Sequence, residues 1–132
     1  MYLKHKPLIV VVDDDQSIRE ALENLISSVG FEVKLFASAE DFLDSDAPLQ
    51  TDCAILDVRL AGISGIELQQ RLAADGQSIP IIIITAQGDD KTRDEAVAAG
   101  AIAFLKKPVK EEVLLAALES ALNGRRMNPV LS

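Results

Sequence analysis

The sequence has little of the chemistry that marks several common classes of protein. A single cysteine, Cys53, excludes a disulfide within the chain and fits a reducing compartment. A single histidine, His5, lies near the N-terminus and is expected to be a solvated side chain, since no second histidine exists to build a zinc site of the usual kind. No apolar run is long enough to span a bilayer, and no signal peptide is recognisable. We therefore expect a cytoplasmic protein without membrane contact.

Positive charge is also scarce. The 132 residues carry 13 Lys and Arg against 21 Asp and Glu, a formal net charge of -8 at pH 7. An acidic surface repels phosphates, so this domain by itself is not expected to contact nucleic acid. The loop after the first apolar run is acidic rather than glycine-rich, which excludes a nucleotide-binding phosphate cradle. The length suits one domain, and 48% hydrophobic residues suffice for a core.

Five expected strands alternate with segments of helical spacing. Residues 8–12, 53–57 and 81–85 are apolar runs typical of buried strands, and two further short strands are expected over residues 31–36 and 101–105. Helices are expected from Ser17 to Gly30, after Ser38, from Gly65, over residues 91–99 and over residues 111–123. This alternation predicts an α/β fold in which a doubly wound, five-stranded parallel sheet has helices on both faces.

Local signals refine this outline. Ser17 and Ser38 each begin a stretch with the form of a capping box, and Asp15 is open to interpretation as a cap or as part of a site. The helix over residues 91–99 is rich in alanine and only weakly amphipathic. The inward face of the last helix is expected to comprise Val113, Leu114, Ala117, Leu118, Ala121 and Leu122.

Polar side chains follow four of the expected strands. Asp13 and Asp14 follow the first, Asp57 ends the third, Thr85 ends the fourth, and Lys107 follows the fifth. The carboxyl ends of parallel strands share one edge, so these groups are expected to meet. Clustered carboxylates repel one another unless a divalent cation such as Mg²⁺ joins them.

This set of groups predicts phosphoryl transfer to an aspartate. A carboxylate beside a metal can attack phosphorus and form an acyl phosphate, and Lys107 and Thr85 are suitable donors to the phosphoryl oxygens. Taken singly, each residue has an ordinary explanation: Thr85 as a strand-end residue, Lys107 as a solvated charge, and Cys53 as a small core residue. The joint placement carries the argument.

With these residues the chain resembles the receiver domain of bacterial two-component response regulators, over residues 8–123. The resemblance rests on the acidic pair after an apolar strand and on Ile55-Leu56-Asp57, Ser64-Gly65, Ile84-Thr85-Ala86, Gly100-Ala101 and Phe104-Leu105-Lys106-Lys107-Pro108. The Ser38-Ala39-Glu40 stretch is most similar to receivers with a LuxR-type helix-turn-helix output. The resemblance implies a flavodoxin-like receiver fold with strand order 2-1-3-4-5.

The resemblance also implies roles for single residues. Asp57 is the phosphoacceptor. Mg²⁺ is held by Asp57, by Asp14 directly, by Asp13 through water, and by the backbone carbonyl of Arg59. The switch residues are Thr85, whose hydroxyl moves to the phosphoryl group, and Phe104, which turns inward. Lys107 contacts the phosphate and precedes a cis Pro108.

The resemblance further implies partners. A sensor histidine kinase supplies the phosphoryl group, and phosphorylation changes the surface of helix 4 and strand 5, with a homodimer through that face and transcription as the output. Such a domain is not an enzyme in the ordinary sense, although it assists its own phosphorylation and dephosphorylation. Leu60 and Ala61 stand where the family often has Met-Pro, and without that proline the loop after Asp57 is expected to be more mobile. Gly62 stands where the family often has Asp, a change that is peripheral to the chemistry.

Two alternatives remain open at this point. Residues 12–17 also fit the start of haloacid-dehalogenase-like phosphatases with Asp13 as nucleophile, although Asp89-Asp90 precedes Lys107, which is the wrong order, and cap insertions are absent. A non-switching interaction adaptor is disfavoured by the intact set of Asp57, Thr85 and Lys107. We expect a receiver domain over residues 1–124 and a tail or the start of a linker over 125–132, in a stand-alone receiver or in part of a longer regulator.

Overall fold

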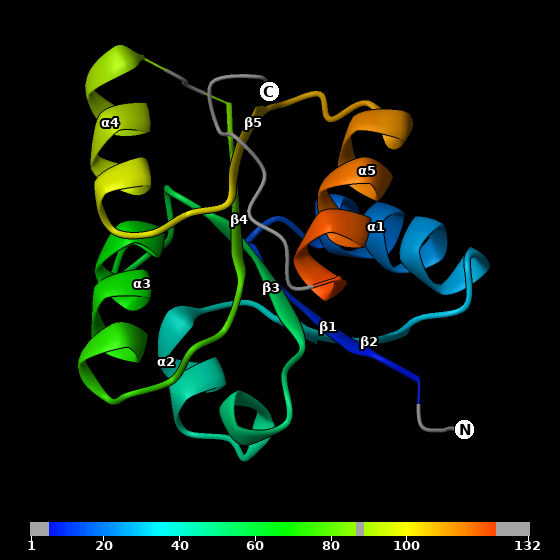
Figure 1. Ribbon diagram of the computed structural model, residues 1–132, viewed down its shortest axis with the longest axis horizontal. Helices are drawn as coiled ribbons and strands as arrows, with labels where there is room; N and C mark the ends of the chain where they lie inside the picture. Colours follow the sequence, from blue (N-terminus) through cyan, green and yellow to red (C-terminus); the bar gives the residue numbers. More distant parts are fainter. Residues whose placement is uncertain (1–5, 87–88, 124–132) are drawn as a thin grey trace.

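The computed structural model describes residues 6–86 and 89–123, which form a parallel sheet between two layers of helices (Figure 1). The strands are β1 (Leu8–Val12), β2 (Glu32–Phe36), β3 (Cys53–Asp57), β4 (Ile81–Thr85) and β5 (Ala103–Lys106), in the order β2-β1-β3-β4-β5. The helices are α1 (Gln16–Ser28), α2 (Ala39–Leu43), α3 (Gly65–Ala74), α4 (Asp90–Ala98) and α5 (Glu111–Leu122), with a short 3-10 helix η1 (Ala47–Leu49) before β3. The predicted fold class and strand order are confirmed.

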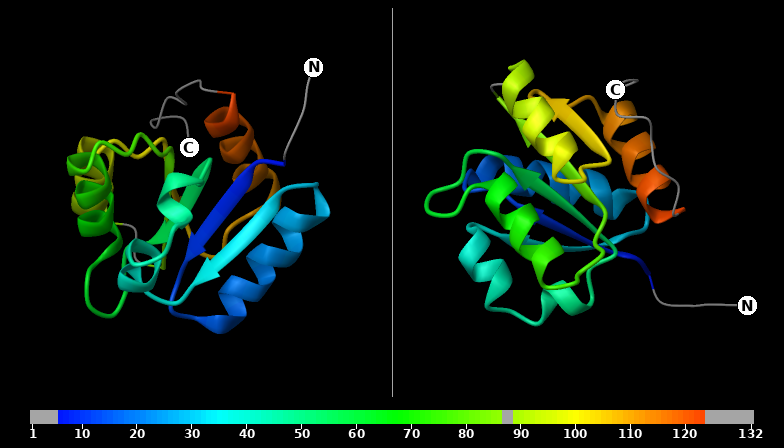
Figure 2. Two further views of the ribbon diagram at one scale, coloured as in Figure 1. Left: turned by 90° about the horizontal axis from the view of Figure 1, so that it is seen from below. Right: turned by 60° about the vertical axis from the view of Figure 1, so that its left-hand side comes forward.

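The continuous apolar runs of β1, β3 and β4 reflect burial on both faces of the sheet. Every residue of these three strands is buried. Alternate residues face opposite layers because side chains along a strand alternate. Val10 packs in the cluster with α2, α3 and α4, whereas Ile9 packs in the cluster with α1 and α5. Figure 2 shows the two layers from further directions. No helix within the described ranges is long and apolar enough to cross a membrane.

The chain order places a switch point between β1 and β3. From β1 the chain passes to β2 on one side and then crosses to β3 on the other side. In the parallel register, Val12 lies beside Leu56, so the residues that follow them share one edge of the sheet. Open α/β sheets bind their ligands at such a point. The fold therefore brings Asp13 and Asp57 together, although they are far apart in sequence.

The first helix begins earlier than its capping box indicates. Asp15, not Ser17, is the N-cap of α1, and its carboxylate accepts hydrogen bonds from the Ser17 and Ile18 amides at 2.8 and 3.3 Å. The prediction of Ser17 as the cap is wrong because Asp15 satisfies the amides of the first turn two residues earlier. The second capping residue is confirmed, since Ser38 accepts a hydrogen bond from the Asp41 amide at 3.0 Å.

Two further expectations need correction. β5 begins at Ala103 rather than residue 101, because the Ala101 amide donates to Ala96 and completes the end of α4. Val113 is 39% exposed rather than inward, since the buried face of α5 is centred on Leu114 and Leu118. Cys53 is a core residue as expected, and burial raises the pKa of its thiol to about 12. The predictions for His5, for Gly124 and for residues 125–132 lie outside the described residues.

Candidate functional site

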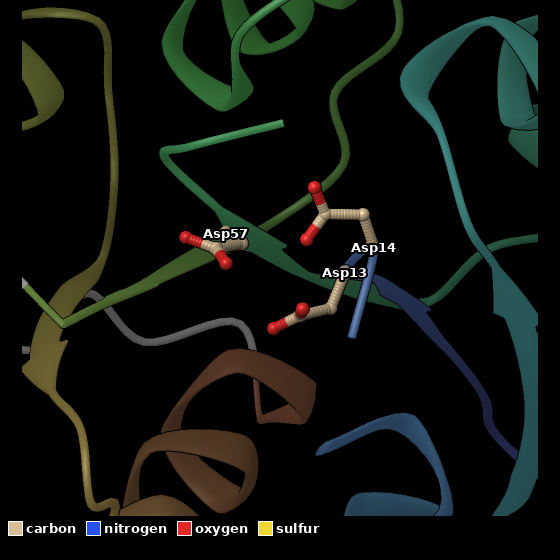
Figure 3. A group of neighbouring side chains, drawn as sticks. All are labelled: Asp13, Asp14 and Asp57. Atoms are coloured by element: carbon tan, nitrogen blue, oxygen red, sulfur yellow. The ribbon is translucent and has the colours of Figure 1, made fainter. Parts of the chain in front are cut away.

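Three carboxylates meet where β1 and β3 end (Figure 3). Asp13 and Asp14 directly follow β1, and Asp57 is the last residue of β3. One carboxylate oxygen from each lies within 4.8 Å of the others. Asp13 is fully buried and Asp57 is 5% exposed, whereas Asp14 faces solvent. The edge of the sheet therefore presents a partly buried cluster of oxygen ligands with an open side.

A lysine from the end of the sheet joins two of these carboxylates. Lys107 Nζ lies 2.8 Å from Asp57 Oδ2 and 2.9 Å from Asp13 Oδ2. The Lys107 amide donates to the Thr85 carbonyl at 2.8 Å, and the bond to Pro108 is cis, as the resemblance implies. Lys106, the neighbouring candidate, is exposed. The structure thus places Lys107, rather than Lys106, at the carboxylate cluster.

The cluster combines buried negative charge with a single ammonium group. Burial raises the pKa of the Asp13 carboxyl, and the negative charge of Asp57 adds to this effect, although donors from Asp15 and Lys107 oppose it. Burial lowers the pKa of the Lys107 ammonium, but hydrogen bonds to Asp57 and Asp13 outweigh burial and leave that pKa raised. With all groups ionised, three carboxylates and one ammonium leave two negative charges in excess, which a divalent cation would balance.

The donor set fits Mg²⁺. The cluster offers only carboxylate oxygens, and one of the three acids is open to solvent, which leaves room for the waters that Mg²⁺ retains. The lone described cysteine, Cys53, is buried within β3 and belongs to the core. A soft-metal site is therefore not supported by the residues in the cluster.

The loop that follows Asp57 turns back tightly onto the strand. The Arg59 amide donates to Asp57 Oδ1 at 3.0 Å, and the Gly65 amide donates to the Val58 carbonyl at 3.1 Å. A Cβ at Gly65 would collide with the Asp57 carbonyl oxygen, so only glycine allows α3 to begin this close to the strand. Ser64 caps α3 through the Glu67 amide at 3.1 Å. The Ser64-Gly65 motif therefore positions the end of β3.

Both expected switch residues are buried. Thr85 is fully buried at the end of β4, where it pairs with Lys106 of β5. Phe104 is 8% exposed and packs in the core cluster on the side of α2, α3 and α4. The inward turn expected for Phe104 would therefore start from a ring that is already buried.

Two residues for which the sequence predicts no role at the site, Arg19 and Glu40, also support it. Arg19 Nη1 donates to the Asp13 carbonyl at 2.7 Å and so ties α1 to the acidic loop. Arg19 lies in the first turn of α1, a few residues after the acidic residues that follow β1, and this spacing could have suggested the contact. Glu40 accepts a hydrogen bond from the Ile63 amide at 3.2 Å, across 23 residues of sequence. No local signal indicates that contact, because it depends on how α2 packs beside the loop.

Comparison with known proteins agrees with this geometry. A family model described as the response regulator receiver domain matches residues 9–119. Response regulator protein TmoT of Ectopseudomonas mendocina is 46% identical over 115 residues, covering 87% of this chain and 52% of that protein. Among solved structures, response regulator StyR is similar with TM-score 0.84 and 50% identity, covering 92% of this chain and 61% of that one. FixJ-N is similar with TM-score 0.82 and 34% identity, covering 91% and 96% respectively. The chain spans about half the length of the curated relatives it matches.

Proposed function

Because this chain belongs to the response regulator receiver domain family, it is a receiver of two-component signalling, and we propose that Asp57 is its phosphoacceptor. One observation carries this assignment. Asp57 ends the central strand β3 beside Asp13 and Asp14, and Lys107 and the Arg59 amide each donate to one of its carboxylate oxygens. A nucleophile, an acidic metal-binding set and a cationic donor therefore meet at one point.

The proposed chemistry is phosphoryl transfer from a phosphohistidine of a sensor histidine kinase. An Asp57 carboxylate oxygen attacks phosphorus, the new P–O bond forms as the P–N bond breaks, and the electron pair leaves with the imidazole nitrogen. Lys107, already 2.8 Å from Asp57 Oδ2, follows the negative charge onto the phosphoryl oxygens. The Thr85 hydroxyl is proposed to donate a hydrogen bond to the same oxygens.

The same proposal assigns the metal ligands. Asp13, Asp14, Asp57 and the backbone carbonyl of Arg59 would hold Mg²⁺, with Asp14 in direct contact and Asp13 acting through water. When bound, Mg²⁺ neutralises charge on the phosphoryl oxygens. The domain is a signalling module rather than a conventional enzyme. Within the proposal, these residues let it assist both its own phosphorylation and its own dephosphorylation.

The proposed output is a change at the face formed by α4 and β5. α4 is held weakly, since Ala96 is its one buried residue. A groove along this face is lined by Asp90, Arg93 and Asp94 of α4, where Arg93 forms ion pairs with both acids, and by the basic residues Lys106 and Lys110. The acidic residues of α4 outnumber its arginine in this groove, which favours a symmetric homodimer in which each α4 lies against Lys106 and Lys110 of the partner subunit. Phosphorylation would shift a pre-existing equilibrium toward this dimer, with Phe104 behind the face.

The setting of the domain is part of the same proposal. We place the receiver within residues 1–124, with residues 125–132 as a tail or linker, in the cytoplasm. Relatives named as transcriptional regulators support a transcriptional output through a further domain, so any contact with DNA would be made there.

The test is the intact mass after incubation with a small-molecule phosphodonor and Mg²⁺. We expect one phosphate adduct on the wild type, none without Mg²⁺, and none on Asp57→Ala. An adduct that persists in Asp57→Ala but disappears in Asp13→Ala would support the phosphatase-like alternative instead. A wild type that takes up no phosphate would support the non-switching adaptor.

A further inference from the structure

The loop between β3 and α3, residues 58–64, is anchored on its far side by a helix that takes no part in the chemistry. Glu40, in the first turn of α2, accepts a hydrogen bond from the Ile63 amide at 3.2 Å. The neighbouring Gly62 has φ +80, and an added Cβ there would collide with the Glu40 carboxylate, whose Cδ would lie 3.2 Å away. The carboxylate therefore lies directly against the backbone of the loop.

This contact completes a set of three anchors around Arg59. On the near side, the Arg59 amide donates to Asp57 Oδ1. At the exit of the loop, the Gly65 amide donates to the Val58 carbonyl. Leu60 and Ile63 of this segment also pack against the core cluster that contains α2, and Glu40 adds a hydrogen bond that fixes the loop backbone beside that helix. The sequence also has Ala61, which does not restrict the backbone as a proline would, so the loop depends more on contacts from outside.

The Glu40 carboxylate is not needed to hold α2 in place. Ser38 already caps this helix by accepting from the Asp41 amide, and Ala39 and Phe42 bury its inner face completely. Glu40 itself is exposed. Its side chain is therefore free to serve the loop, and its removal is expected to leave the helix folded.

Resting on the proposed function of Asp57, we propose that Glu40 is a positioning residue for the phosphoacceptor site. By holding the Ile63 amide, it fixes the loop that carries Arg59 and thereby raises the affinity of the site for Mg²⁺ and the rate of phosphoryl transfer to Asp57. Residues that orient a metal ligand from outside typically change metal affinity by about 10- to 100-fold. We expect the lower end of that range, because Glu40 is exposed and acts on the loop backbone.

The test compares Mg²⁺ binding by calorimetry in the full chain and three variants. Glu40→Ala should bind Mg²⁺ about tenfold more weakly, at the lower end of the range for such residues. Glu40→Gln should bind Mg²⁺ as tightly as the wild type does, because its side-chain carbonyl can still accept a hydrogen bond from the Ile63 amide. Asp41→Ala is the matched control: it removes one negative charge from the same helical turn but no contact with the loop, and it should bind as the wild type does.

Amide hydrogen exchange gives a second readout independent of activity. The Ile63 amide should exchange faster in Glu40→Ala than in Asp41→Ala or Glu40→Gln. Equal Mg²⁺ affinity in Glu40→Ala and Asp41→Ala, or a failure of Glu40→Gln to restore it, would overturn the inference. If the wild type bound Mg²⁺ but gained no phosphate on Asp57, the proposed function would fail irrespective of Glu40. A wild type that is phosphorylated, with unchanged Mg²⁺ binding in Glu40→Ala, would refute only the role of Glu40.

Discussion

Lys107 Nζ donates a 2.8 Å hydrogen bond to Asp57 Oδ2, and the two residues are 50 positions apart in the sequence. The same nitrogen lies 2.9 Å from Asp13 Oδ2. One ammonium thus neutralises part of the charge of two largely buried carboxylates before any phosphoryl group arrives. The acidic cluster is therefore stable in the folded protein, yet it keeps an excess of negative charge for a cation.

Replacing Lys107 with methionine should destabilise the protein in the absence of Mg²⁺. The change leaves Asp13 and Asp57 without their cation, and Lys107 is itself 16% exposed, so we expect a loss of about 2 kcal/mol, below the range for fully buried pairs. Lys106→Met alters an exposed neighbour and should change the free energy of unfolding by less than about 0.5 kcal/mol. Urea unfolding of both variants measures the difference, and equal losses would contradict this role of Lys107.

Mg²⁺ should stabilise the wild type against urea. A ligand that binds only the folded state at 100 times its dissociation constant adds about 2.7 kcal/mol. Asp14→Asn should remove most of this gain, because it replaces one of the three carboxylates that could hold the ion. Asp15→Asn should keep the gain, since Asp15 is the cap of α1 and asparagine caps equally well. Equal Mg²⁺ stabilisation in the two variants would exclude Asp14 as a ligand.

The cap of α4 should control the mobility of that helix. The Asp89 carboxylate accepts from the Thr92 amide at 2.8 Å, and hydrogen bonds from the Thr92 side chain and backbone lower the pKa of Asp89 below its ordinary 3.8. Asp89→Ala should speed amide exchange throughout α4, whereas Asp89→Asn should not, because asparagine is also a good N-cap.

The same cap has a pH dependence of known sign. Because the folded-state pKa of Asp89 is lowered, its stabilising effect is present above the ordinary value and is lost as pH falls through the lowered folded value. Exchange in α4, corrected for intrinsic rates, should therefore rise at acid pH in the wild type and not in Asp89→Asn. A rise of the same size in both proteins would assign the effect to other groups.

A buried side-chain hydrogen bond links α3 to α4. Gln69 Nε2 donates to the Ala96 carbonyl at 3.1 Å, while Gln69 Oε1 is buried with no partner among the described residues. The Ala96 carbonyl also accepts from the Ala101 amide, so it keeps a partner when Gln69 is replaced. Gln69→Met should therefore change the free energy of unfolding by less than about 1 kcal/mol, because it also removes a buried unpaired oxygen.

The effect of Gln69→Met on α4 should be larger than its effect on stability. With the link removed, amides of α4 should exchange faster, and Ala96 is the one buried residue left to hold the helix. Gln70→Met, at an exposed position of the same helix, is the control and should leave exchange in α4 unchanged. A large loss of stability without faster exchange would show that Gln69 serves the core alone.

Local patterns predicted the strands well because each buried strand is a short, continuous apolar run. β3 and β4 have the predicted bounds, and Asp57 and Thr85 lie at their ends as expected. Cap positions were less predictable. Asp15 and Ser17 are both good caps, and the choice between them depends on where the turn after β1 directs the chain.

The sequence by itself determined the alternation of strands and helices, the apolar runs that make β1, β3 and β4 fully buried, and the polar residue types at the strand ends. Periodicity and turn chemistry are local properties, so they can be recognised without a fold. Only the tertiary structure decided that Lys107 joins Asp13 and Asp57, that Gly65 lies against the Asp57 carbonyl, and that Glu40 holds Ile63. These contacts join segments far apart in the chain, and their geometry is set by how the helices pack on the sheet, which no local pattern encodes.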